Sequence, residues 1–69
     1  MTLDLAPTNT RFKIHSCRST RLQEIGFTEG EHIEIIARAA FRGPIAVKVG
    51  CSVFALRLEE AEQIKLCEL

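Results

Sequence analysis

The stretch LQEIGFTEGEHIEII, residues 22–36, determines the fold of this chain, because a helical pattern changes to a strand pattern within it. Just before it, Thr20 stands at capping-box spacing from Gln23, which predicts that a helix begins here. Leu22 and Ile25 then form an apolar pair on one side of that helix. The stretch therefore opens with a short helix that buries one face.

Two glycines separate the helix from the strand. Gly26 stands where a left-handed residue closes a helix, and Gly30 can take a positive φ in the turn that follows. We interpret both as conformational. The period of two that comes next predicts a strand from about residue 31 to 38, with Ala37 directed inward and Ile36 on the opposite face.

The same alternation predicts four further strands. They cover residues 11–15, 45–49, 53–56 and 63–66. Gly43-Pro44 is a turn signal, so the preceding residues should form the tip of a hairpin that ends at Pro44. Residues 58–61 favour one helical turn. Five short antiparallel strands in so small a chain favour closure into an SH3-like barrel, mainly β, with one short α-helix between the first two strands.

The chain has room for one domain. It contains 69 residues, of which we interpret 1–10 as an extended leader, with Leu3 and Leu5 on one side, and 11–67 as the barrel. Nine basic and nine acidic residues cancel, which disfavours binding to bulk nucleic acid. No apolar run could span a bilayer and no signal peptide is recognisable, so we expect a cytoplasmic protein without membrane insertion.

The cysteines indicate neither a disulfide framework nor a zinc ribbon. Cys17, Cys51 and Cys67 are odd in number and widely spaced. His15 and Cys17 lie two residues apart, which would place two ligands for a transition metal on one strand face. Two ligands are too few for a metal site, so we interpret His15 and Cys17 as a solvated strand end and expect that no cofactor is required. Weak binding of ferrous iron or another transition metal stays open.

Three segments together resemble the ferrous iron transport protein A (FeoA) family. They are RLQEIGFTEGEHIEI, RAAFRGPIAVKV and FALRLEEAEQIKL. The matching positions are Leu22, Ile25, Gly26, Phe27, Gly30, Ile33, Ile35, Pro44, Ala55, Leu56, Arg57, Glu60 and Ala61. The same domain type is similar to the C-terminal domain of iron-dependent repressors of the diphtheria-toxin-repressor (DtxR) type.

The sequence departs from the family pattern in three places. Glu29 replaces a turn proline, Ala40 replaces the first loop proline, and Arg42-Gly43 stands where Gly-Asp is usual. The lost prolines should loosen the turn and loop slightly, because proline restricts the unfolded chain. The resemblance implies a small cytosolic accessory protein of ferrous iron uptake, recruited by the cytoplasmic GTPase portion of the FeoB membrane transporter.

No catalytic arrangement and no phosphate-cradling loop are recognisable, so a binding module fits better than an enzyme. Phe41 and Arg42 are the strongest candidates for partner contact, since aromatic residues and arginine dominate interface energetics. The alternative is that Phe41 folds back and caps the barrel. A second candidate contact is the helix, through Arg21, Glu24 and Ile25.

One other function is kept as an alternative, and another is disfavoured. The first is a stand-alone regulatory or peptide-binding domain that responds to iron, similar to the repressor domain. The second is a small RNA-binding barrel, which is disfavoured by the neutral charge and by the absence of Tyr and Trp for base stacking. Either a monomer or a weak homodimer is compatible with the sequence.

Overall fold

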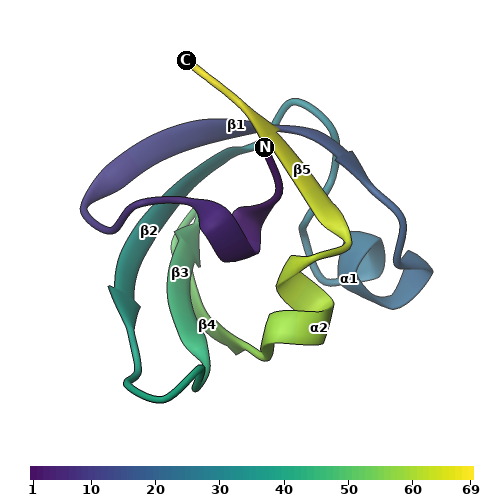
Figure 1. Cartoon of the computed structure of the whole chain (residues 1–69). Coiled ribbons are helices and arrows are strands. Elements are labelled where there is room, and N and C mark those ends of the chain that lie inside the picture. The colour runs from purple at the N-terminus through teal and green to yellow at the C-terminus, as the bar shows by residue number, and fades with distance from the viewer.

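The computed structural model describes all 69 residues and shows one antiparallel sheet with strand order β4-β3-β2-β1-β5 (Figure 1). The strands are β1 (Thr10–Cys17), β2 (His32–Arg38), β3 (Ile45–Val49), β4 (Ser52–Leu56) and β5 (Ile64–Cys67). The helical elements are η1 (Leu3–Leu5, a 3-10 helix), α1 (Thr20–Glu24) and α2 (Leu58–Ala61). The predicted mainly β fold of five antiparallel strands is therefore confirmed, with small differences at the strand ends.

The sheet curls around an apolar core because bulges bend two of its strands. One bulge lies in β1 between Ile14 and Ser16, and the other lies in β2 between Ile35 and Ala37. An extra residue on one strand of a pair bends that strand and increases its twist. In Figure 1 the sheet accordingly wraps from β4 round to β5, and α2 connects these two edge strands.

The bulge in β2 also decides which of its side chains reach the core. Ala37 is exposed, and Ile36, the extra residue, has 37% of its surface accessible. The prediction that Ala37 points inward was wrong, because a bulge interrupts the period of two and turns the following residues over. The same shift places Arg38 opposite the buried Ile45 of β3.

Fifteen side chains form the core, and all of them are apolar. They come from every strand, from both helices and from the N-terminal segment. The core residues are Leu3, Ala6, Phe12, Ile14, Leu22, Phe27, Ile33, Ile35, Ile45, Val47, Val49, Leu56, Ala61, Ile64 and Leu66. Phe27 is the largest of the fully buried side chains, and its ring centroid lies 5.0 Å from that of Phe54.

The N-terminal segment is tied to the free edge of β5. The amide of Leu66 donates to the carbonyl of Met1 at 2.7 Å, and Thr2 forms a bridge with Lys65. The helical turn of η1 then buries Leu3 and leaves Leu5 72% exposed. The expectation of an extended leader with both leucines on one side was wrong, because a 3-10 turn does not keep residues two apart on the same face.

Helix α1 begins one residue earlier than the sequence indicated. Ser19 is its N-cap, and the Ser19 hydroxyl accepts from the Leu22 amide at 3.2 Å. The predicted capping box of Thr20 and Gln23 is absent, because Gln23 instead donates its side-chain amide to the Cys17 carbonyl at 2.5 Å. Both Ser19 and Thr20 can cap a helix, and only the backbone shows which one does.

The end of α1 is a Schellman motif. The Gly26 amide donates to the Gln23 carbonyl and the Phe27 amide donates to the Leu22 carbonyl, at 3.2 and 3.0 Å. Gly26 has a φ of 127°, which glycine adopts without a steric penalty. The motif directs Phe27 into the core, and Gly30 follows with the predicted positive φ of 91°.

Replacement of Phe27 by Ala should destabilise the domain severely, whereas the same change at Phe41 should not. Phe27 is fully buried and Phe41 fully exposed, so the Phe27→Ala variant leaves a cavity that costs about 3 to 5 kcal/mol of unfolding free energy. Phe41→Ala should change it by no more than about 0.5 kcal/mol. Urea denaturation followed by circular dichroism measures both, and equal losses would contradict the assignment of the core.

The cap of α1 is tested by comparing Ser19→Ala with Thr20→Ala. Loss of the Ser19 hydroxyl leaves the Leu22 amide without its partner and should cost about 0.5 to 2 kcal/mol. The Thr20 hydroxyl makes no bond within the helix terminus, so its removal should change stability much less. A larger loss of stability in the Thr20 variant, measured by the same urea titration, would show that Thr20 and not Ser19 is the N-cap.

Candidate interaction surface

The β2–β3 hairpin closes in a tight turn whose two central residues are Phe41 and Arg42. The Gly43 amide donates to the Ala40 carbonyl at 3.1 Å, and φ is 58° at Phe41 and 59° at Arg42. Positive φ at both central positions is the pattern of a type I′ hairpin turn. At the base of the tip the Ala39 amide donates to the Pro44 carbonyl at 3.0 Å, as expected for a hairpin that ends at Pro44.

The residues in this turn are poorly suited to its backbone. Type I′ turns favour Asn-Gly, because glycine has no β-carbon and Asn tolerates the left-handed region, in which other side chains cost roughly 1 to 2 kcal/mol. At position 43, by contrast, glycine is required for steric reasons, since a Cβ there would lie 2.7 Å from the Cβ of Ala39. The chain thus carries a bulky aromatic residue and an arginine in a strained turn, and strain of this kind points to a functional site.

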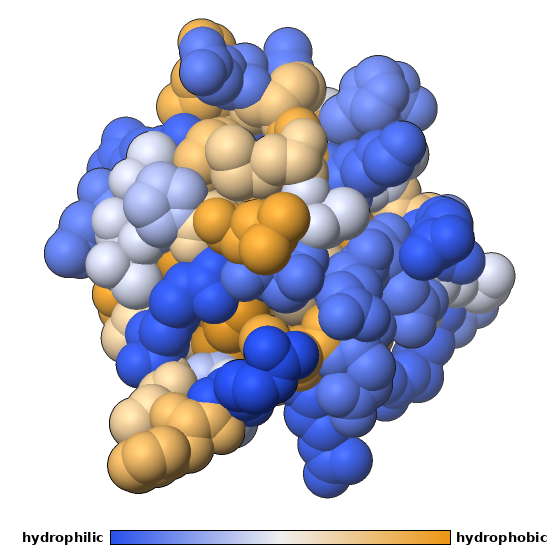
Figure 2. Space-filling view, in the orientation of Figure 1, coloured by the Kyte–Doolittle hydropathy of each residue, from blue (hydrophilic) through white to orange (hydrophobic).

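Phe41 is fully exposed and does not cap the barrel. Of the two alternatives for this ring, the structure therefore supports projection into solvent. In Figure 2 apolar atoms protrude at the lower left, where Figure 1 shows the tip of the β2–β3 hairpin. A second apolar area lies over η1, with strongly hydrophilic atoms between the two areas.

Arg38 connects the hairpin to η1. The β2 bulge places it opposite Ile45, which faces the core, so its side chain reaches the side of the sheet on which η1 lies. Its guanidinium donates to the Ala6 carbonyl, from Nε at 3.1 Å, and to the Leu3 carbonyl, from Nη2 at 3.3 Å. These bonds satisfy the end of η1 and hold the exposed Leu5 beside the turn.

A cavity of about 270 Å³ lies between η1 and the hairpin tip. Its lining combines two arginines and a carboxylate with apolar and small residues: Asp4, Leu5, Arg38, Ala39, Arg42, Gly43 and Leu58. The Oδ1 atom of Asp4 is inaccessible to solvent and has no hydrogen-bond partner. The turn, the cavity and η1 make one continuous surface with apolar flanks and a charged centre.

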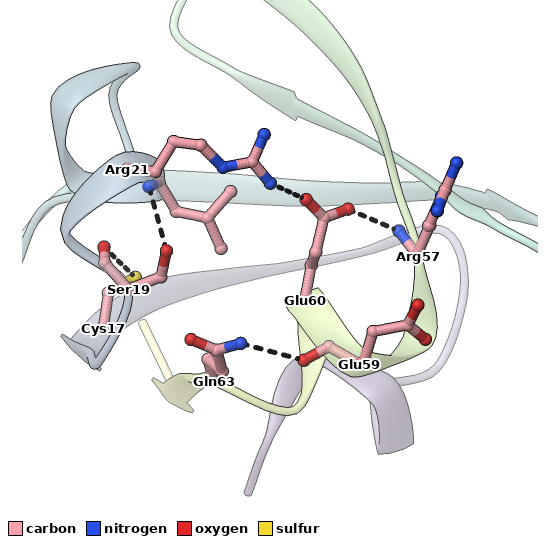
Figure 3. A network of polar contacts seen from close by, with 8 residues as sticks. Cys17, Ser19, Arg21, Arg57, Glu59, Glu60 and Gln63 are labelled. Atoms are coloured by element: carbon pink, nitrogen blue, oxygen red, sulfur yellow. Dashed lines mark hydrogen bonds and ion pairs between the residues drawn. The ribbon is translucent and has the colours of Figure 1, made fainter.

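The helix residues predicted to contact a partner lie elsewhere. Arg21 of α1 forms an ion pair with Glu60 of α2, and the other carboxylate oxygen of Glu60 accepts from the Arg57 amide at 2.9 Å (Figure 3). Glu24 is exposed, and Ile25 is 47% exposed. The guanidinium of Arg21 is therefore engaged within the domain, which leaves the other two as the accessible part of this group.

The two predicted groups do not form one surface. In Figure 1, α1 lies at the right of the molecule and the hairpin tip at the lower left, with the curled sheet between them. Arg42 instead lines a cavity together with residues of η1 and the first residue of α2, Leu58. Asp4, Leu5 and Arg38 carry no sequence signal that associates them with the turn, because a strand bulge and a 3-10 helix bring them there.

His15 and Cys17 are not brought together on one face. The bulge in β1 makes His15 the extra residue, exposed to solvent, and places Cys17 opposite the buried Ile64 of β5. Cys17 packs against the core and its thiol donates to the Ser19 carbonyl at 3.6 Å. The structure contains no group of three or more His, Cys, Asp or Glu residues arranged to hold a metal ion. None of its helices has both the length and the apolar character needed to cross a membrane.

Comparison with solved structures gives close matches over nearly the whole chain. Stenotrophomonas maltophilia FeoA, complexed with zinc and described as a prokaryotic SH3 domain protein, is 32% identical with a TM-score of 0.86, covering 97% of this chain and 89% of that one. Iron(II) transport protein A from Clostridium thermocellum is 30% identical with a TM-score of 0.87, covering 96% of this chain and 44% of that one. This chain thus spans less than half of the second protein.

A more distant match shows how widely the fold is shared. A manganese-dependent transcriptional repressor is 17% identical with a TM-score of 0.88, and the similarity covers 100% of this chain but 41% of the repressor. At this identity the comparison concerns the fold alone. The SH3-like architecture expected from the sequence is confirmed, and so is its similarity to a repressor domain.

Sequence comparison identifies the family. No curated protein sequence matches the chain significantly, but a family model, the FeoA domain, matches residues 1–66. The match includes the N-terminal segment that closes the edge of β5 as well as all five strands except the last residue of β5. Together with the S. maltophilia structure, it shows that this chain belongs to the FeoA family, which is associated with ferrous iron transport.

Proposed function

We propose that this protein is an accessory protein of ferrous iron uptake that binds the cytoplasmic GTPase portion of a FeoB-type transporter. It acts from the cytoplasm, as a binding module and not as an enzyme, and is recruited to the membrane by its partner. Membership of the FeoA family supports the link to ferrous iron transport. The S. maltophilia relative, described as a candidate activating factor for that transport, supports an accessory role.

The observation that carries the proposal is the strained turn at Phe41 and Arg42. Both residues have positive φ, and Phe41 is fully exposed. A turn that served only to connect β2 and β3 would be more stable with Asn-Gly. Aromatic residues and arginine are enriched where binding energy is concentrated, so recognition of another protein explains why this pair stands at the tip.

Glu24, the last residue of α1, and the C-cap residue Ile25 form a second candidate contact. They lie apart from the turn, and their neighbour Arg21 is held by Glu60. We place the main contact at the turn because the cost of strain has to be offset there, whereas α1 shows no comparable strain. Variants at the two places show which of these contacts the partner uses.

The double variant Phe41→Asn with Arg42→Gly should make the domain more stable and the complex weaker. Asn-Gly fits the type I′ backbone, so unfolding should cost about 1 kcal/mol or more of additional free energy. Affinity for the isolated GTP-binding domain of the transporter should fall at least tenfold, because both side chains that face the partner are removed. Urea denaturation and isothermal titration calorimetry measure the two changes.

A gain in stability excludes unfolding as the cause of weaker binding. The comparison variant is Glu24→Ala with Ile25→Ala, which removes the second candidate contact at the end of α1 and should lower the affinity less than the turn variant does. The proposed contact would be wrong if the α1 variant lost affinity and the turn variant kept it. No binding by the unaltered protein, with or without ferrous iron, would favour the alternative of a stand-alone regulatory domain.

The complex is expected to form without metal. Binding measured anaerobically should show the same dissociation constant, within about twofold, with chelator and with added ferrous iron, because neither Phe41 nor Arg42 is a metal ligand. Amide-resolved NMR under both conditions identifies any site of iron binding. Affinity that required iron, together with shifts at His15 and Cys17 that vanish in a His15→Ala variant, would contradict metal-independent binding.

A further inference from the structure

The surface between η1 and the hairpin tip suggests the chemistry of the segment that it binds. We call it the η1–turn surface and define it by five residues: Asp4, Leu5, Arg38, Phe41 and Arg42. Two of them, Leu5 and Phe41, are strongly exposed apolar side chains. Three are charged, and all but Phe41 line the cavity of about 270 Å³.

The charge at the centre of this surface is not neutralised within the chain. The two ion pairs of the protein are Arg11 with Glu34 and Arg21 with Glu60, so neither arginine of the surface has a carboxylate partner. Arg38 donates to backbone carbonyls, which are dipoles and leave its positive charge in place. With one carboxylate, Asp4, against two guanidinium groups, the surface favours an anionic group.

The size of the cavity limits what can enter it. A cavity of about 150 Å³ holds a benzene molecule, so about 270 Å³ accommodates one side chain and not a helix or a second strand. A carboxylate is the natural occupant, because the planar guanidinium of arginine forms paired hydrogen bonds with it. The exposed Leu5 and Phe41 then offer apolar area to the residues before and after that carboxylate.

We propose that the η1–turn surface binds a segment of the partner protein in which one aspartate or glutamate is flanked by apolar residues. The acidic side chain enters the cavity and pairs with Arg42 and Arg38, while the apolar residues pack on Leu5 and Phe41. This proposal rests on the proposed function and adds the chemistry of the recognised segment to it.

Asp4 moderates this interaction. Its carboxylate lines the same cavity, and its Oδ1 atom has no donor within the chain. Its negative charge opposes an incoming carboxylate, since like charges close together repel. Asp4 therefore lowers the affinity of the surface for an acidic segment, and its replacement by Asn keeps the shape of the side chain while removing that charge.

The test compares charge changes on and off this surface in binding to the transporter GTP-binding domain. Arg42→Glu should weaken binding at least tenfold at low salt, and Asp4→Asn should tighten it about two- to fivefold. Arg18→Glu is the matched control, because Arg18 is exposed, lines a different cavity with Glu62 and Lys65, and undergoes the same change of charge. It should alter affinity less than twofold at moderate ionic strength.

Reversal of individual surface acids in the partner domain then identifies the recognised segment. One such partner variant, with a single Asp or Glu changed to Lys, should bind the Arg42→Glu variant with at least half of the lost affinity restored. Suppose that the unaltered proteins bind, but Arg42→Glu and Arg18→Glu have the same effect or Asp4→Asn weakens binding. The proposal that the surface recognises an acidic segment is then wrong, while the proposed partner is still supported. If the unaltered proteins do not bind at all, the proposed function itself fails.

Discussion

A single sheet of five short strands has to enclose fifteen apolar side chains, and it can do so only by curling sharply. The bulges in β1 and β2 supply that curvature. Each bulge also turns over the residues that follow it. The bend in β2 carries Arg38 to the side of η1, and the bend in β1 directs Cys17 toward the core and leaves His15 in solvent. The shape of the core thus decides which polar groups meet.

The elements of this fold could largely be predicted from the sequence, because burial on one face of a strand leaves a period of two in the apolar residues. The stretch from Leu22 to Ile36 shows the limits of such patterns. Its helix, its glycine turn and its strand are all present, but the cap belongs to Ser19 and Ala37 faces outward. A choice between adjacent capping residues and the insertion of a bulge depend on long-range packing, which local patterns do not record.

The candidate site could be predicted only in part, for the same reason. Gly43-Pro44 indicated a turn and drew attention to Phe41 and Arg42. The positive φ of both residues, which makes the turn costly, has no signature in residue type. The approach of Asp4, Leu5 and Arg38 to the turn requires the helical conformation of η1 and the β2 bulge. The chain accepts local strain at the tip, while the network at α1 and α2 (Figure 3) satisfies its polar groups internally.

The position of β1 in the sheet has a consequence for synthesis in the cell. β1 is made before the other strands, yet its neighbours are β2 and β5, and β5 ends at Cys67. While the ribosome still holds residues 64–67, one edge of β1 has no partner and the apolar interior is open to water. Pairings between residues so far apart in the chain are slow to form. The other pairings, β1 with β2, β2 with β3 and β3 with β4, join consecutive strands, so only the closure of the core has to follow the emergence of β5.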